Sequence, residues 1–391
     1  MTISEQSVRL HAKVRGKIEI NSRVPLETSL DLSLAYTPGV AEPCRRIHQE
    51  PDLVYQYTSR GNMVAIVTDG TAVLGLGDIG AEASLPVMEG KAILFKEFGG
   101  VDAFPLCLNT KDPGEIVSIV KALEPTFGGI NIEDIAAPAC FEIERRLREE
   151  LSIPVFHDDQ HGTAVVTLAA LINSLKLAEK AMEEIHIVIN GAGAAGIAIA
   201  RLLMAEGATD IVLADRCGIL HPDRQKGMNP EKAEMARITN PRRISGGLER
   251  AMEGADVFIG VSAKDAVTME MVRSMAQRPV VMAMANPDPE ILPEDALAAG
   301  AFIVCTGRSD FPNQVNNVLA FPGIFRGALD VRAREINEEM KRAAAQAIAE
   351  MVRPEELTVD YVIPGALNRE TGLLVGKKVA QAARDSGVAR L

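Results

Sequence analysis

Hydrophobic and polar positions alternate in two rhythms along the chain from residue 63 onward. Short apolar runs at 63–67 and 103–108 predict β-strands, whereas the stretches 86–98 and 113–123 carry apolar residues at helical spacing and predict helices. Residues 1–62 lack this alternation, so we expect mostly loop there, with a short helix at 41–48. Strands that alternate with helices are typical of α/β folds with parallel sheets.

The alternation continues to the C-terminus, beginning with an apolar helix at 163–178 and a β-branched strand at 185–190. Further strands are predicted at 211–215, 257–261, 280–285 and 302–305, and further helices at 197–205, 318–331, 336–351 and 373–383. A chain of 391 residues is long enough for two cores. We expect an N-terminal α/β domain at 1–160 and a second α/β domain with C-terminal helices at 161–391.

A glycine-rich turn follows the strand at 185–190 and opens the next helix. Its sequence, Gly-Ala-Gly-Ala-Ala-Gly, has the spacing of a dinucleotide-binding turn, and an aspartate ends the following strand. This pattern predicts a Rossmann-type, doubly wound NAD(P)-binding domain. The predicted cofactor-binding residues in this unit are Gly191, Gly193, Ala194, Ala195, Gly196 and Asp215.

Asp215 bears on the choice of cofactor. A carboxylate at this position can bind the hydroxyls of the adenine ribose and repels a 2′-phosphate, which favours NAD over NADP. Arg216 and Arg224 lie close enough in sequence to accommodate a phosphate, and an alternative role for Asp215 is only to cap the turn. We therefore expect NAD as cofactor, with NADP possible.

Two pairs of adjacent carboxylates, Glu133-Asp134 and Asp158-Asp159, follow short apolar runs at 129–132 and 153–156, with a helix predicted between them at 138–151. The strand–helix–strand order lays the strands parallel and brings both C-terminal ends to one edge of the sheet. Converging carboxylates repel one another unless a cation lies among them, and ligation by oxygen alone favours Mg²⁺ or Mn²⁺. A single pair of this kind is more often a solvated cap.

Composition narrows the classes of partner. The chain is 47% hydrophobic and 24% charged, and we expect no apolar run as long as the roughly eighteen residues of a membrane span. The first nine residues are polar and carry no signal-peptide pattern, so a cytoplasmic location is expected. Five scattered cysteines argue for reduced thiols, and a net charge of −12 disfavours nucleic acid as a partner.

Six blocks, taken together and in order, resemble malic enzymes of the short prokaryotic form over nearly the whole chain. The resemblance implies a malic-type N-terminal domain and the conversion of (S)-malate and NAD(P)⁺ to pyruvate, CO₂ and NAD(P)H with Mg²⁺ or Mn²⁺. It also implies a homodimer with the N-terminal segment near the interface. The blocks are Tyr36 to Ala41, Val67 to Gly70 with Leu74 to Asp78, Pro86 to Lys91, Asn131 to Asp134, Asp158 to Gln160 with Gly162 to Ala164, and Asn316-Asn317 with Phe321 to Gly323.

By the same resemblance, the expected metal ligands are Glu133, Asp134 and Asp159, with Asp158 as the partner of a catalytic lysine. That lysine, Lys91, is expected to take the proton of the C2 hydroxyl, which requires burial and the metal to lower its pKa. Tyr36 is the expected acid that protonates C3 after CO₂ leaves.

Substrate and cofactor contacts complete the resemblance. Asn286 and Asn317 are expected to bind the substrate together with Lys91, and Gly75 and Asn286 are expected beside the cofactor. One departure is Thr71-Ala72, which stands where longer members of the family carry an arginine for the substrate carboxylate. Arg308 and Arg326 are the remaining candidates for that contact.

Two other functions share some of these features. A metal-independent hydroxy-acid or amino-acid dehydrogenase would also combine a lysine with a Rossmann unit, and it would keep its turnover when metal is removed. A non-catalytic nucleotide-sensing protein would keep the fold with damaged catalytic positions, whereas every matched position here is intact.

Overall fold

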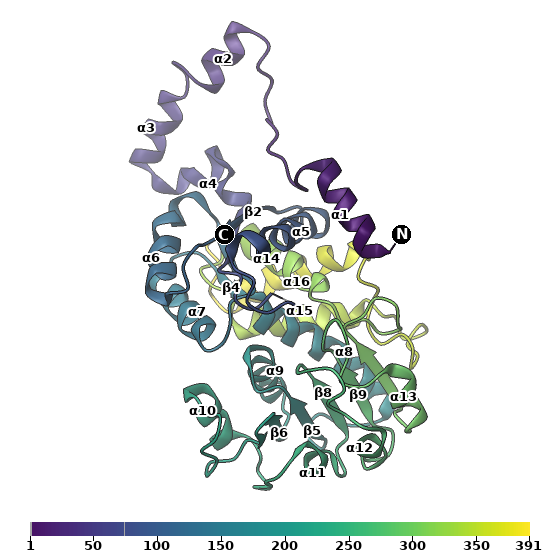
Figure 1. Cartoon of the computed structure of the whole chain (residues 1–391). Coiled ribbons are helices and arrows are strands. Elements are labelled where there is room, and N and C mark those ends of the chain that lie inside the picture. The colour runs from purple at the N-terminus through teal and green to yellow at the C-terminus, as the bar shows by residue number, and fades with distance from the viewer. Residues whose placement is uncertain (1, 74) are drawn as a thin grey trace.

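The computed structural model describes residues 2–73 and 75–391 (Figure 1). Its first sheet is formed by four parallel strands in the order β2-β1-β3-β4. Three of these strands are apolar and almost entirely buried, whereas β2, at the edge of the sheet, is mostly half-buried. The strands are β1 (Met63–Thr68), β2 (Asp102–Cys107), β3 (Gly129–Ile132) and β4 (Val155–His157). All four lie within two residues of the predicted bounds, so this part of the α/β prediction is confirmed.

Helices α5 (Ala81–Gly99), α6 (Pro113–Leu123) and α7 (Ala139–Glu150) connect these strands. The bounds of α6 match the prediction, but the prediction that α5 begins at Pro86 is wrong by five residues. Gly80, at φ +80°, precedes the first helical residue, and Pro86 lies inside the helix. Pro86 is the sixth residue of α5 and removes the hydrogen bond to the carbonyl four residues earlier, yet the helix continues through it.

The second sheet has six strands in the order β10-β9-β8-β5-β6-β7, and all neighbours are parallel except β6 and β7. Its strands are β5 (His186–Asn190), β6 (Asp210–Asp215), β7 (Gly218–Ile219), β8 (Val257–Gly260), β9 (Val280–Ala283) and β10 (Ile303–Thr306). The antiparallel strand β7 was not predicted. Helices around this sheet are α8 (Thr163–Ala178), α9 (Ala194–Ala205), α10 (Pro230–Ile238), α11 (Leu248–Met252), α12 (Met269–Arg273) and α13 (Pro293–Ala298).

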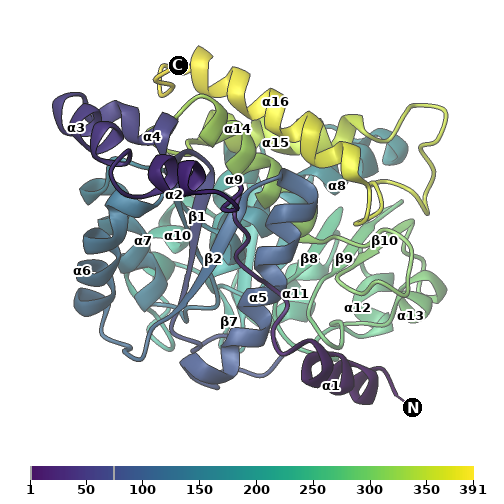
Figure 2. The same cartoon turned by 90° about the horizontal axis from the view of Figure 1, so that it is seen from above.

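Three C-terminal helices, α14 (Phe321–Asp330), α15 (Glu338–Glu350) and α16 (Arg369–Asp385), join the two sheets. Phe321 and Phe325 of α14 pack against Phe95 of α5, with ring centroids 4.7 and 5.3 Å apart. In Figure 2, α16 lies beside α14 and α15 on the outside of the molecule. These helices follow the second sheet in sequence but complete the core of the first, and the division at residue 160 stays a prediction.

Helix α8 corrects the expectation that no apolar run has the length of a membrane span. With the π-helical turn η4 (Asp158–Gly162) before it, the helix Asp158–Ala178 covers 21 residues at a mean hydropathy of 1.2. Of that apolar window, 72% is buried inside the fold, against α9, α15 and the rest of the core. A buried core helix of a globular protein can also be long and apolar enough to span a membrane, and α8 has that burial.

More than half of residues 2–57 are helical, so the prediction of mostly loop is wrong, although the short helix predicted at 41–48 is confirmed. They form α1 (Ile3–Val14), α2 (Ser29–Ala35), α3 (Ala41–Gln49) and α4 (Val54–Tyr57), and none of these helices has a buried residue. Capping boxes at Thr2 and Thr28 start α1 and α2 without any apolar face packed on a core. Four short 3₁₀ turns complete the described chain: η1 (Pro51–Leu53), η2 (Ser59–Asn62), η3 (Glu124–Thr126) and η5 (Asn317–Leu319).

The segment between α1 and α2 runs along α5 (Figure 2). Lys17 fixes it there, because its backbone N donates to Glu89 at 2.9 Å and its Nζ donates to the Pro86 carbonyl at 2.6 Å. Beyond this segment, α2 and α3 stand away from both sheets, at the top of Figure 1. We call residues 26–40, with the apolar side chains of α2, the N-terminal arm.

Candidate active site

The carboxylates predicted to converge do so, at the C-terminal ends of β3 and β4. Glu133 and Asp134 follow β3, and the chain after β4 enters η4, which carries Asp158 and Asp159 directly into α8. A π-helical turn holds one more residue than an α-helical turn and often occurs at functional sites. Gly162 closes it, because a Cβ there would lie 1.8 Å from Asp158 Oδ1.

Glu133, Asp134 and Asp159 each offer an oxygen to one point. These atoms lie within 4.8 Å of one another, and Glu133 and Asp134 are 7% and 4% exposed. Burial, and then the charge of Asp159, raises the pKa of Asp134 to about 7, and burial also raises the pKa of Glu133. Among the described residues, Asp134 Oδ2 is buried without a hydrogen-bond partner. Three crowded oxygen donors with an unsatisfied atom fit a hard divalent cation.

Lys91 of α5 lies between two of these carboxylates. Its Nζ is 2.9 Å from Glu133 Oε1 and donates to Asp158, and the ring centroid of Phe321 is 4.1 Å away. Burial lowers the pKa of Lys91, but the charges of Asp158 and Glu133 outweigh burial and raise it. The expected lowering of this pKa is therefore not seen in the protein alone, because the expectation did not include direct contact with two carboxylates.

Asn317 brings the C-terminal part of the chain to the same cluster. Its Nδ2 donates to Asp158 Oδ2 at 3.1 Å and to Thr163 Oγ1 at 3.2 Å. Asp158 is fully buried, with Lys91 on one side and Asn317 on the other. The structure thus joins five of the predicted site residues to Asn317 at the edge of the first sheet.

The glycine-rich turn between β5 and α9 has the geometry of a dinucleotide site. Gly191 has φ +120°, and a Cβ there would lie 2.4 Å from the Val261 carbonyl. A Cβ on Gly196 would lie 1.8 Å from the Gly191 carbonyl, whereas one on Gly193 would meet no atom within 4 Å. The first and third glycines are required by packing, and the second leaves open space where a pyrophosphate can approach the start of α9, at Ala194 and Ala195.

Asp215 is not free to act as predicted. Arg224 Nη2 donates to both of its oxygens, at 2.7 and 2.8 Å, and Lys232 Nζ donates at 2.7 Å. Burial would raise the pKa of Asp215, but these hydrogen bonds outweigh it and lower it. Two cations offset the carboxylate, so the repulsion of a 2′-phosphate that favoured NAD is weaker than expected. Sequence proximity suggested Arg224 but could not show this bidentate pair.

Gly75 and Asn286 lie where the two sheets face each other. A Cβ on Gly75, at φ +72°, would lie 3.0 Å from Pro287 Cδ, so the turn after β1 approaches the end of β9. Asn286 Nδ2 is 3.4 Å from the Met284 carbonyl, and Gly307 leaves room for this amide. Leu74, which belongs to the same block as Gly75, lies outside the described residues.

Tyr36 does not join this cluster within one chain. It is the C-cap of α2 and is 67% exposed, and α2 stands away from both sheets (Figure 1). Sequence blocks carry no information about distance in space, so this separation was not predictable.

The two arginines considered for the substrate carboxylate already have partners. Arg326 donates to Asn62 Oδ1 at 2.6 Å. Asn62 precedes β1, so it lies at the opposite end of the strands from the carboxylates, and Arg326 is excluded as the residue that binds the substrate carboxylate. Arg308 pairs with Asp310 at 2.6 Å and stays on the correct edge, after β10.

Two buried glutamates were missed by the sequence analysis. Glu290 is fully buried and accepts hydrogen bonds from Ser262 N at 2.7 Å and Ala285 N at 3.1 Å, which ties the ends of β8 and β9 together beside the glycine turn. Glu144 is 7% exposed and binds the turn η4. A buried glutamate on a helix rich in surface charge has no distinguishing sequence signal.

A lysine among converging carboxylates on one sheet, facing a dinucleotide turn on the other, defines a two-domain NAD(P)-dependent oxidoreductase. Residues 15–148 match the family described as malic enzyme, N-terminal domain, and residues 160–384 match malic enzyme, NAD binding domain. The chain belongs to the malic enzyme family, and it catalyses the oxidative decarboxylation of malate to pyruvate and CO₂ with reduction of NAD(P)⁺.

Individual relatives agree with this assignment. The bifunctional malic/malolactic enzyme of Bacillus subtilis (strain 168) is 61% identical over 391 residues, covering 100% of this chain and 95% of that protein. The NADP-dependent malic enzyme of Escherichia coli (strain K12) is 49% identical, covering 96% of this chain and 51% of that longer protein. The crystal structure of the NAD-dependent malic enzyme of Thermotoga maritima has a TM-score of 0.92 at 52% identity, covering 96% of this chain and 98% of that one.

Proposed function

We propose that the enzyme requires Mg²⁺ or Mn²⁺, held by Glu133, Asp134 and Asp159. The observation that carries this proposal is the convergence of three carboxylate oxygens within 4.8 Å of one another. In addition, Asp134 Oδ2 is buried without a hydrogen-bond partner among the described residues. When bound, a divalent cation would polarise the substrate hydroxyl and then the keto oxygen. Carboxylates that otherwise raise one another's pKa would be neutralised by it.

Lys91 is the proposed base that takes the proton of the C2 hydroxyl. Ligation of Glu133 leaves Asp158 as the remaining anionic partner of the lysine, so the ammonium is less stabilised and gives up its proton more readily. Asp158, oriented by Asn317, keeps the amine aimed at the substrate. A nicotinamide bound beside Asn286 would accept the hydride of C2; once CO₂ has left the carboxylate on C3, Tyr36 returns a proton to C3.

A direct experiment is to follow reduced nicotinamide by absorbance with L-malate and NAD⁺ or NADP⁺, each with Mn²⁺ and with EDTA, and to assay pyruvate. Reduction that requires Mn²⁺ and yields equimolar pyruvate supports the proposal. Reduction that survives EDTA and yields oxaloacetate would identify a metal-independent dehydrogenase instead.

NAD is the proposed preferred cofactor, bound at Gly191, Gly193 and Gly196 with Asn286 and Gly75 at the nicotinamide end. The support is the carboxylate of Asp215 at the end of β6, moderated by its pairing with Arg224 and Lys232. NADP is accepted if these two cations turn toward a 2′-phosphate. The ratio of kcat/KM for the two cofactors tests the preference, and a ratio favouring NADP would reject it.

The active form is proposed to be a homodimer in which the N-terminal arm of each chain supplies Tyr36 to the partner's site. The arm carries unburied apolar side chains, among them Leu30, Leu34 and Tyr36, at 65%, 67% and 67% exposure. Apolar surface of this kind marks an interface. The site of one chain contains Lys91 but not Tyr36, so it is incomplete without a second copy.

Mixed dimers test the shared site. Tyr36→Phe and Lys91→Ala chains, each inactive alone, are combined by unfolding and refolding together. If Tyr36 acts in the partner's site, one site of each mixed dimer has both residues and activity returns. Tyr36 acting in its own chain would leave every site defective, and light scattering that finds only monomers would also reject the proposal.

A second activity, conversion of malate to lactate and CO₂, is favoured by the 61% identity to a relative named as a malic/malolactic enzyme. Pyruvate would then be reduced by the reduced cofactor before either leaves, with no net redox change. Lactate formed in molar excess over NAD⁺ supports this activity, and only pyruvate, limited by the amount of NAD⁺, rejects it.

The proposed setting is the cytoplasm, with malate and pyruvate as the small-molecule partners. A net charge of −12 is the support for expecting neither nucleic acid nor anionic membrane as a partner. Fractionation of cells that express the protein tests the location.

A further inference from the structure

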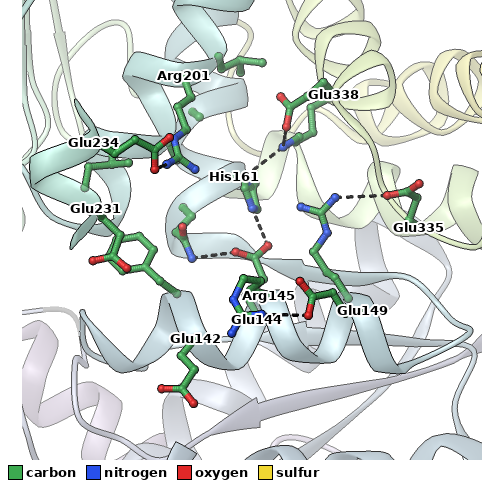
Figure 3. Close-up of a pocket in the computed structure, with 18 residues that line it drawn as sticks. Glu142, Glu144, Arg145, Glu149, His161, Arg201, Glu231, Glu234, Glu335 and Glu338 are labelled. Carbon is green, nitrogen blue, oxygen red and sulfur yellow. Dashed lines mark hydrogen bonds and ion pairs between the residues drawn. The ribbon is translucent and has the colours of Figure 1, made fainter. Parts of the chain in front are cut away.

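A cavity of about 740 Å³ lies between α7 of the first domain and α9, α10 and α15 of the second (Figure 3). Gln160 and His161 of the turn η4 form part of its wall, together with Glu144 and Lys341. Helix α9 packs against the turn, but the side chains of Gln160 and His161 border the cavity. What holds η4 in place toward the cavity is a set of hydrogen bonds.

Those hydrogen bonds converge on Glu144. Its Oε2 accepts from Gln160 Nε2 at 3.0 Å, and its Oε1 lies 2.6 Å from His161 Nε2. On the other side of the imidazole, Lys341 Nζ lies 3.3 Å from His161 Nδ1 and also pairs with Glu338. Because an ammonium can only donate, Nδ1 of His161 accepts from Lys341, and the protonated Nε2 donates to Glu144. Figure 3 shows Glu144 from α7 and His161 facing each other across this contact.

The two residues that donate to Glu144, Gln160 and His161, directly follow Asp159 in the sequence. The side chain of Asp159 is 36% exposed; it accepts a 2.8 Å hydrogen bond from the backbone N of Asp134, and its other charged neighbour is His157 Nδ1 at 3.9 Å. Glu144 and Lys341 are 7% and 3% exposed, and they reach the turn from different domains. Groups that orient metal ligands in this way commonly change metal affinity by about 10- to 100-fold when removed.

We infer that Glu144 is a positioning residue: by binding Gln160 and His161 together, it sets the turn η4 so that Asp159 meets Glu133 and Asp134. Lys341 supports it from the second domain. The inference rests on the proposed role of Asp159 as a metal ligand. Neither Glu144 nor Lys341 is among the residues proposed above to hold the metal, the substrate or the cofactor.

The test is Glu144→Gln, whose amide presents one acceptor and one donor to two donors. Calorimetry on the metal-free protein should give a Kd for Mn²⁺ at least tenfold above wild type, with the Kd for NAD⁺ within twofold. Amide hydrogen exchange in the peptide that covers 158–162 should be faster, also without metal. Glu149→Gln, an exposed change on the same helix, is the matched control and should match wild type.

If Glu144→Gln does not fold, Lys341→Met serves, with a smaller rise in the same Kd. Wild-type Mn²⁺ affinity and exchange in the folded variant would overturn the inference while leaving the metal site standing. An equal loss of Mn²⁺ and NAD⁺ affinity would also overturn it, because the role would then be general stability. A wild-type protein that binds no Mn²⁺ would reject both the metal site and this inference.

Discussion

Replacing Asp134 with asparagine should stabilise the metal-free enzyme at pH 8. Asp134 is 4% exposed beside Glu133 and Asp159, and burial followed by the charge of Asp159 raises its pKa from 3.8 to about 7. The folded protein therefore binds this proton more tightly than the unfolded chain. The free energy that this tighter proton binding adds to folding is fully present below pH 3.8 and is lost as the pH rises through about 7.

The size of the effect follows from that shift. About three pKa units, at roughly 1.36 kcal/mol each, place the penalty above pH 7 on the order of 4 kcal/mol. About two of these units fall between pH 5 and pH 7, so the advantage of Asp134→Asn over wild type should grow by about 3 kcal/mol between pH 5 and pH 8. Mn²⁺ at about 100 times its Kd should add roughly 2.7 kcal/mol to the wild type and much less to the variant.

Urea unfolding in EDTA, followed by circular dichroism at pH 5, 6, 7 and 8, measures this difference. Asp223→Asn, at an exposed position, is the control and should follow the wild-type curve. If the free energies of unfolding of Asp134→Asn and wild type change in parallel with pH, the reasoning is refuted, because the pKa of Asp134 would then not be raised by folding.

Three further outcomes are expected. Lys91→Ala should lower the rate of pyruvate formation by about 10²-fold or more, the lower range for a general base, and a rate near wild type would remove Lys91 from that role. Asp215→Ala frees Arg224 and Lys232, so the ratio of the Kd for NADP⁺ to that for NAD⁺ should fall by about tenfold, as two charge-assisted contacts to a phosphate become available; an unchanged ratio would place the cofactor elsewhere. Phe95→Ala should cost about 3–5 kcal/mol in urea unfolding, whereas Phe104→Ala, at 39% exposure, should cost much less; similar losses would contradict the packing described.

Strands and buried helices of this fold could be predicted closely, because their patterns reflect burial. The bounds of α6 and α8 match the prediction, and β1 and β3 to β6 deviate by at most two residues. α1 and α2 bury nothing and were missed despite their capping boxes, although α3, which also buries nothing, was predicted at 41–48. The two-residue strand β7 is stabilised by its partner β6, which no local pattern reports.

The site was predictable where topology alone brings residues together. Glu133, Asp134, Asp158 and Asp159 follow neighbouring parallel strands, so their convergence required only the strand–helix–strand order. Glu144 and Lys341 act through side chains from two helices far apart in sequence, which no spacing indicates. The pairing of Asp215 with Lys232 and the position of Tyr36 depend on loop and arm conformations for the same reason.

The packing of α14 against α5 has a consequence for synthesis of the chain. The rings of Phe95 and Phe156 pack against Phe325, which is synthesised after every strand of the second sheet. A fragment that stops at residue 160 would expose these rings, so it should aggregate when expressed alone. The sheet that is translated first is thus among the last parts of the molecule whose core is completed.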